Sequence, residues 1–207
     1  MVGRSLAGKL VTLGHEVRMG ARDASNERAA GWARESGGSH GTFADAAGFG
    51  DAIVNATAGT ASIDALDAAG MERLAGKVLI DVANPLDPSR GMPPPLAYCN
   101  EDSLGERIQA SFPEARVVKT LNTVNANVMV DPSLVPGEHT VFVCGDDPAA
   151  KAQVAELLVS FGWPEGSILD LGGIESSRVC EMYLALWLRL WNAAGTANLN
   201  IAVRRGS

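Results

Sequence analysis

The sequence has few of the features that mark secreted, metal-binding or membrane proteins. Its three cysteines, Cys99, Cys144 and Cys180, are widely spaced and odd in number. This spacing argues against a disulfide framework and a Cys-x-x-Cys metal or redox site, so we expect reduced thiols in a cytoplasmic protein. The most apolar run, at 182–188, is too short to cross a bilayer, and no membrane partner is expected.

Basic residues are also in the minority. The 207 residues include 17 Lys and Arg against 24 Asp and Glu, and the net charge of −7 disfavours nucleic acid as the main partner. The histidines, His15, His40 and His139, are scattered along the chain. Neither a metal site nor a Ser/His/Asp order is recognisable, so the sequence assigns no catalytic residue.

Short β-like runs alternate with helical segments. Strands are predicted at 16–19, 52–56, 78–82, 115–119, 139–144 and 167–171. Helices are predicted at 1–13, 26–35, 63–74, 103–112, 148–161 and 175–194. This alternation predicts an α/β fold with a doubly wound, mostly parallel sheet of the Rossmann type. We expect residues 1–172 to form the dinucleotide-binding domain and 173–207 a small C-terminal helical part, with 195–203 returning as loop and strand.

The first residues have an order that normally follows the first strand of a dinucleotide-binding βαβ unit. A helix at 1–13 leads through Gly14 into a strand and then a basic residue. In the G-x-G-x-x-G fingerprint the last glycine lies in the first helical turn, and Gly3 fits that position. We therefore expect a Rossmann sheet that lacks its first strand and the G-x-G turn. A chain that simply starts with a helix is the alternative.

The end of the next strand suggests the cofactor. NAD enzymes place an acidic residue there, whereas NADP enzymes place a basic one. Here Ala21 is small and Arg22 can bind a 2′-phosphate with two parallel hydrogen bonds. Pairing of Arg22 with Asp23 on the surface is the alternative, and Arg28 is a weaker candidate for the same phosphate.

Polar and small residues follow three further strands. Thr57 and Ala58 follow the first of them, Asn84 and Pro85 the second, and Asn122 the third. Ligands of open α/β sheets bind at the carboxyl ends of the strands, so we expect these residues to contact the dinucleotide, with the asparagines at the nicotinamide. Turn or capping roles are the alternative.

Long blocks of the sequence resemble a known family, the NADPH-dependent oxidoreductases of the deazaflavin coenzyme F420. They are "VGRSLAGKLVTLGHEVRMGARD", "DVANPLD", "GMPPPLAYCNEDSLGERIQASFPEARVVKTLNTVNANVMVDP" and "LDLGGIESSRVCEMYLALWLRLWNAAGTANLNIAV". The resemblance implies NADP as cofactor and coenzyme F420 as a candidate co-substrate. It also supports the role of Arg22, because relatives have a small residue followed by Arg at this point. Characterised reductases carry a histidine where this chain has Asn122.

Two segments are predicted to border an acceptor site. The proline-rich stretch at 84–102 follows a strand end and is long for a connection inside a compact domain. The helix at 182–191 is apolar all round, which predicts a core or subunit-interface helix and a homodimer, while one edge of it could cover a flat acceptor.

Taken together, these features predict an NADP-dependent oxidoreductase that transfers hydride between NADPH and a deazaflavin-like or other small acceptor. A non-catalytic dinucleotide-binding or sensing protein is one alternative. A reductase of a different small substrate on the same scaffold is another.

Overall fold

The computed structural model of the chain describes residues 1–206. The helices are α1 (Val2–Thr12), α2 (Glu27–Ser36), α3 (Phe43–Phe49), α4 (Ser62–Ala69), α5 (Met71–Leu74), α6 (Leu104–Ser111), α7 (Ala126–Val130), α8 (Pro148–Phe161) and α9 (Ser177–Ala194). The strands are β1 (Arg18–Ala21), β2 (Ser39–Thr42), β3 (Ala52–Asn55), β4 (Val78–Asp81), β5 (Arg116–Thr120), β6 (Val141–Cys144) and β7 (Ile168–Asp170).

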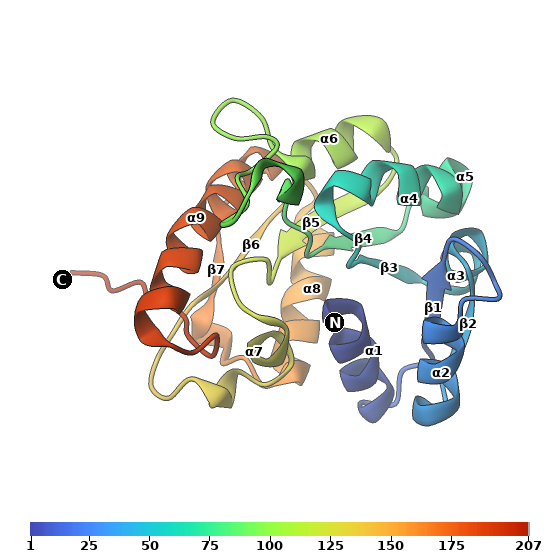
Figure 1. Cartoon of the computed structure of the whole chain (residues 1–207), viewed down its shortest axis with the longest axis horizontal. Coiled ribbons are helices and arrows are strands. Elements are labelled where there is room, and N and C mark those ends of the chain that lie inside the picture. Colours follow the sequence, from blue (N-terminus) through green and yellow to red (C-terminus); the bar gives the residue numbers. More distant parts are fainter. Residues whose placement is uncertain (207) are drawn as a thin grey trace.

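The strands form a mostly parallel arrangement with helices on both sides (Figure 1). Five strands make one sheet in the order β3-β4-β5-β6-β7, and β1 pairs with β2 in a second, two-stranded sheet. Every pairing is parallel except that between β5 and β6. The predicted α/β, Rossmann-type fold is therefore confirmed, and β3, β4 and β5 end at a common edge of the larger sheet.

No strand of residues 1–206 joins the two sheets. β1 pairs with β2 alone and β3 with β4 alone, so each has one edge without a ladder partner, as the sequence predicts. The start of α1 lies close to the end of β3, because a Cβ on Gly3 would stand 3.6 Å from the Cβ of Ala56. This is an ordinary van der Waals distance, and the role of Gly3 as the third glycine of the fingerprint stays a prediction.

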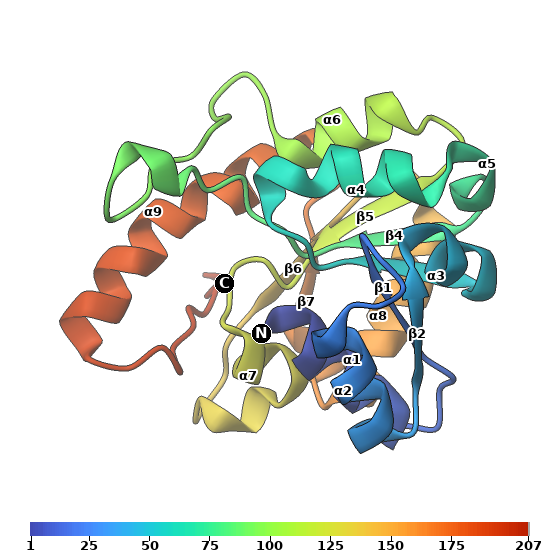
Figure 2. The ribbon, with the colours of Figure 1, turned by 45° about the vertical axis from the view of Figure 1, so that its right-hand side comes forward.

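Alternating side chains of the central strands face two hydrophobic cores. Val78 and Ile80 of β4 pack with residues of α1, α7 and α8. Leu79, between them, packs on the opposite side with residues of α4, α5 and α6. Figure 2 shows α4 and α6 lying along this second side of the sheet. The period-2 pattern of a strand buried on both faces produces this arrangement.

Some predicted boundaries were wrong. The single helix expected at 63–74 is two, α4 and α5, because Gly70 between them has a φ of 93° that a helix does not allow. The strand expected within 195–203 does not form. That segment contributes one backbone hydrogen bond toward β6, from Thr140 N–H to the Ile201 carbonyl at 2.8 Å.

Three elements were not predicted, namely β2, α3 and α7. The four residues of β2 include Gly41 and His40, which carry little strand signal. A signal for α3 does exist, because Thr42 and Asp45 form a capping box at its start. The division of the chain at residue 172 stays a prediction.

The free edges of β1 and β3 generate a test. A variant chain that carries a strand and a G-x-G turn, about ten residues in all, ahead of α1 should be more stable, because the added strand can pair between the two sheets. Urea unfolding and NADPH titration of the two chains measure stability and affinity. A matched extension with Pro at alternate strand positions is the control. Equal behaviour of all three chains would contradict a strand position between β1 and β3.

Candidate functional site

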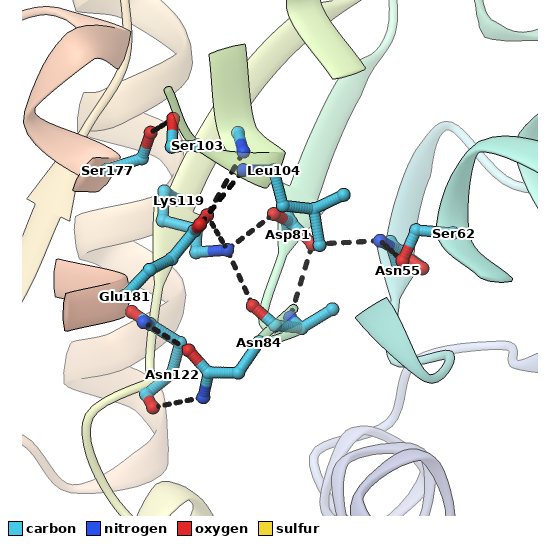
Figure 3. A network of polar contacts seen from close by, with 12 residues as sticks. Asn55, Ser62, Asp81, Asn84, Ser103, Leu104, Lys119, Asn122, Ser177 and Glu181 are labelled. Carbon is cyan, nitrogen blue, oxygen red and sulfur yellow. Dashed lines mark hydrogen bonds and ion pairs between the residues drawn. The ribbon is translucent and has the colours of Figure 1, made fainter. Parts of the chain in front are cut away.

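A buried group of three charges ties the ends of β4 and β5 to the C-terminal helix α9. The Lys119 ammonium lies 2.8 Å from the Asp81 carboxylate and 2.8 Å from the Glu181 carboxylate. Both Lys119 and Asp81 side chains are fully buried and Glu181 is 1% exposed. Figure 3 shows Glu181 reaching from α9 toward the two strand ends.

Neighbouring polar groups satisfy the remaining hydrogen-bonding capacity of these charges. Lys119 also donates to the carbonyl of Ala83 at 2.5 Å. Asp81 accepts from the Asn55 amide at 2.8 Å. Glu181 accepts from the backbone N–H groups of Leu104 at 2.9 Å and Gly105 at 3.1 Å. These are the first residues of α6, where the helix dipole favours a negative charge.

Burial and the neighbouring charges shift the pKa values of Lys119 and Glu181 in opposite directions. Burial tends to lower the pKa of Lys119, but the carboxylates of Asp81 and Glu181 outweigh it and hold the pKa above its ordinary value. Burial raises the pKa of Glu181, and the nearby Lys119 ammonium offsets only part of that rise. Lys119 therefore keeps its proton, and Glu181 holds a proton to higher pH than an ordinary glutamate does.

Beside the charged group, two asparagines join the same strand ends. Asn84 donates through its amide to the Asn122 carbonyl at 2.8 Å and accepts from the Asn122 amide at 2.9 Å. The Asn122 amide also donates to the Cys180 carbonyl of α9 at 3.0 Å. The predicted pair is thus brought together, with Asn122 buried and Asn84 half-buried (Figure 3).

The segment after β3 completes this edge. The Thr57 hydroxyl donates to the side chain of Asn55 at 2.7 Å, and Ala58 is exposed. Gly59 lies against the backbone of the next segment, because a Cβ there would stand 2.1 Å from the Asn84 carbonyl oxygen and 2.8 Å from the Cα of Pro85. Only glycine allows this approach, which places the ends of β3 and β4 side by side.

Arg22 stands apart from these residues, immediately after Ala21 at the end of β1. Its side chain is exposed and forms no ion pair within residues 1–206. Asp23, the alternative partner, instead accepts from the backbone N–H and the hydroxyl of Ser25, both at 2.8 Å. The guanidinium is available for an anion.

On the side of α9, a pocket of about 220 Å³ opens next to Asn122. We refer to it as the Tyr183 pocket, and it is lined by Thr123, Phe142, Leu171, Val179, Cys180, Tyr183 and Ile201. A larger hollow of about 750 Å³ at the start of α8 is open and lies away from the strand ends described above.

Comparison with known proteins decides the family. A solved structure from Arthrobacter sp. FB24, provisionally named an F420-dependent NADP reductase, is 53% identical to this chain. It superposes with a TM-score of 0.93 over 99% of this chain and 95% of that one. The family described as "NADP oxidoreductase coenzyme F420-dependent" matches residues 1–85. The chain belongs to this family.

Membership in the F420-dependent family places the chain among NADP-dependent oxidoreductases. The metalloreductase STEAP3 of Rattus norvegicus is 30% identical over 133 residues, or 64% of this chain, and the chain spans about a quarter (25%) of that protein's length. A reductive aminase of Aspergillus terreus, solved with NADPH4, is 17% identical, with a TM-score of 0.63 over 94% of this chain and 59% of that chain. This last likeness shows the fold alone.

Sequence reasoning missed the most buried part of the site. Lys119 ends the strand predicted at 115–119, and the sequence patterns above assign no role to Lys119, Asp81 or Glu181. A signal was present, because a charged residue inside an otherwise apolar strand or helix needs a buried partner.

Residues 1–206 contain no group of His, Cys, Asp and Glu side chains that could bind a metal ion. Among the helices of these residues, none has both the length and the hydrophobicity needed to span a membrane.

The buried charges predict a large cost for removing the cation. Lys119→Met should lower the free energy of unfolding by about 3–5 kcal/mol, because two buried carboxylates lose their counter-charge. Lys151→Met is the control, since its partner Asp170 is 53% exposed although Lys151 itself is 13% exposed, and the loss should be about 1 kcal/mol or less. Urea unfolding measures both, and equal losses would contradict the assigned role of Lys119.

The raised pKa of Glu181 predicts that the free energy of unfolding depends on pH. Its pKa in the folded chain lies above the ordinary value of 4.5, so the folded chain holds this proton to higher pH than the unfolded chain. The free energy of unfolding should therefore fall as pH rises from the ordinary pKa through the raised one. Glu181→Gln removes this contribution and should flatten that part of the stability profile. Urea unfolding across a pH series measures this dependence. The same change of unfolding free energy with pH in the original chain and in Glu181→Gln would refute the prediction.

Proposed function

We propose that the chain binds NADPH along the ends of β1, β3, β4 and β5 and transfers its hydride to a small acceptor beside α9. The observation that carries this proposal is the meeting of Asn84 and Asn122 at adjacent strand ends, next to the Tyr183 pocket. Family membership supports NADP as the cofactor.

The residues at this edge fit an NADP molecule. The unpaired guanidinium of Arg22 follows the small Ala21, which leaves room for a ribose 2′-phosphate. The first turn of α1 has no side-chain cap, so its backbone N–H groups can meet a pyrophosphate near Gly3. Thr57 and Ala58 offer a small, open surface at the end of β3.

Asn84 and Asn122 are proposed to orient the nicotinamide end. NADPH supplies the hydride when it is bound, and the protein has to hold donor and acceptor at van der Waals distance. Asn122 is fixed between Asn84 and the Cys180 carbonyl. The hydrogen bonds between Asn84 and Asn122 hold both side-chain amides in place, so the amides need not rearrange when the nicotinamide binds.

The acceptor is proposed to be a deazaflavin such as coenzyme F420, as the family's description suggests, or another small molecule. Asn122 stands where the resemblance places a histidine in characterised deazaflavin reductases, so F420 has to be tested beside other small acceptors. The loop at 84–102 is proposed to help close the site, and an isolated bridge between Leu86 and Leu96 gives it local order. Loss of NADPH absorbance in the presence of F420 tests the reaction. NADPH binding without turnover on any acceptor would favour the sensing alternative.

Arg22 predicts the cofactor preference. Arg22→Ala should weaken NADPH binding by about 1.5–3 kcal/mol and leave NADH binding nearly unchanged, because only NADPH carries the 2′-phosphate. Arg34→Ala is the matched control, as Arg34 lies exposed in the last turn of α2. Calorimetric titration with both nucleotides measures the effect. Equal weakening of NADPH and NADH would count against a phosphate contact.

We further propose that α9 forms a homodimer interface in a cytoplasmic protein. Buried residues of α9 such as Leu184 and Trp187 face the domain, while Val179, Leu186 and Trp191 are about half exposed. An amphipathic helix with a second apolar face is expected to meet a partner copy.

Sedimentation tests this proposal. The chain should sediment as a dimer at micromolar concentration, and Leu186→Asp should shift it toward the monomer because a charge would be buried in the interface. Asp67→Asn on α4 is a control that changes surface charge elsewhere. A monomer at every concentration would contradict the dimer.

A further inference from the structure

The segment after α9 returns along the start of β6, and we refer to residues 196–204 as the C-terminal strap. It leaves α9 at Gly195, whose φ of 66° turns the chain away from the helix. From Asn200 onward, every hydrogen bond or ion pair between the strap and the rest of residues 1–206 goes to residues 138–140. Ile201 of the strap also forms part of the wall of the Tyr183 pocket. One short stretch of chain therefore holds this part of the wall in place.

His139 and Asn200 form the central contact of the strap. The Asn200 amide donates to the Thr140 carbonyl at 2.9 Å, and its nitrogen lies 2.9 Å from Nδ1 of His139. The Asn200 side-chain oxygen accepts from the Ile201 N–H at 2.8 Å. A carbonyl can only accept and an N–H can only donate, so Thr140 and Ile201 fix which end of the amide faces His139. Nδ1 of His139 must therefore accept the hydrogen bond.

The other ring nitrogen of His139 completes the assignment of its proton. Nε2 lies 3.0 Å from the Pro132 carbonyl, to which it can only donate. A ring that donates through Nε2 and accepts through Nδ1 is neutral imidazole. A protonated ring would carry N–H at both nitrogens and would point one of them at the NH₂ group of Asn200. Turning the Asn200 amide over would break its hydrogen bonds to Thr140 and Ile201.

The surroundings of His139 offer no counter-charge for a proton on the ring. Glu138, its neighbour in the chain, pairs with Arg204 of the strap. Asp131 accepts hydrogen bonds within its own turn. The indole of Trp163 meets the ring edge-on, with the ring centroids 5.1 Å apart. His139 is 9% exposed and forms no ion pair within residues 1–206, so a protonated ring would be a buried, unpaired charge.

We propose that the C-terminal strap is a pH-sensitive cover of the Tyr183 pocket, held while His139 is neutral and released when the ring takes up a proton. The proton comes from solvent and binds Nδ1, where it displaces the hydrogen bond from Asn200. Histidine is the side chain whose charge changes between about pH 5 and pH 8, so acidic pH favours release. Release takes Ile201 out of the wall and widens the pocket next to Asn122.

NMR relaxation tests the strap without NADPH or any acceptor, so this inference and the proposed function can fail separately. The order parameters of the Ile201 and Val203 N–H groups should be about 0.8 near pH 7.5 and should fall below about 0.6 near pH 5.5. A soluble gadolinium chelate should then broaden the Ile201 methyl signals. Val141 in β6 is the internal reference and should stay rigid at both pH values.

Two outcomes would overturn the proposal. Equal order of Ile201 and Val203 at both pH values would show that the strap does not respond to acid. Loss of order at Val141 as well would show that the domain unfolds, and that the strap does not open by itself.

Variants identify the sensor. His139→Asn should hold the strap at both pH values, because an amide oxygen can accept from Asn200 in acid as well. Asn200→Ala should leave the strap mobile at both, because its contact with His139 is absent. His15→Asn, in the exposed turn after α1, is the control and should respond like the original chain. Release in acid by His139→Asn, or a pH response in Asn200→Ala, would refute His139 as the sensor.

Discussion

The rest of the structure depends on the buried ammonium of Lys119. It is the single cation between two carboxylates, one from the end of β4 and one from α9. Removing charges from water is costly, and the cost is recovered only when every charge is paired and hydrogen-bonded. The backbone N–H groups at the start of α6 complete that pairing through Glu181. One side chain therefore sets how the sheet, α6 and α9 meet.

The strands β4 and β5 that hold Asp81 and Lys119 also position the asparagines proposed to contact the nicotinamide. Asp81 and Lys119 are direct partners in the β4–β5 register. Asn84 and Asn122 each follow their charged residue at the same spacing, and they too are paired. The charged pair and the amide pair form two successive layers at one edge. Since both layers also contact α9, the helix that lines the Tyr183 pocket cannot shift without disturbing the proposed nicotinamide contacts.

Much of this fold could be predicted because its strands are short apolar runs separated by long amphipathic helices. The limits of β3, β4 and α8 follow directly from that pattern. β2 could not be found, because four residues with a central glycine have no clear period. The site was predicted in part. Polar residues after strands are visible in sequence, but the contact between Glu181 and Lys119 joins residues far apart in the chain. A charge within an apolar helix indicates that Glu181 has a buried partner, but no local pattern shows that this partner is Lys119.

The most direct test of the central claim is a crystal structure of the chain grown with NADPH. Density for the nicotinamide ring should appear in contact with Asn84 and Asn122, with the ring face turned toward the Tyr183 pocket. Density for the 2′-phosphate should appear beside Arg22. Density for NADPH at the open hollow near the start of α8, or on any surface away from the ends of β3, β4 and β5, would contradict binding at the strand ends.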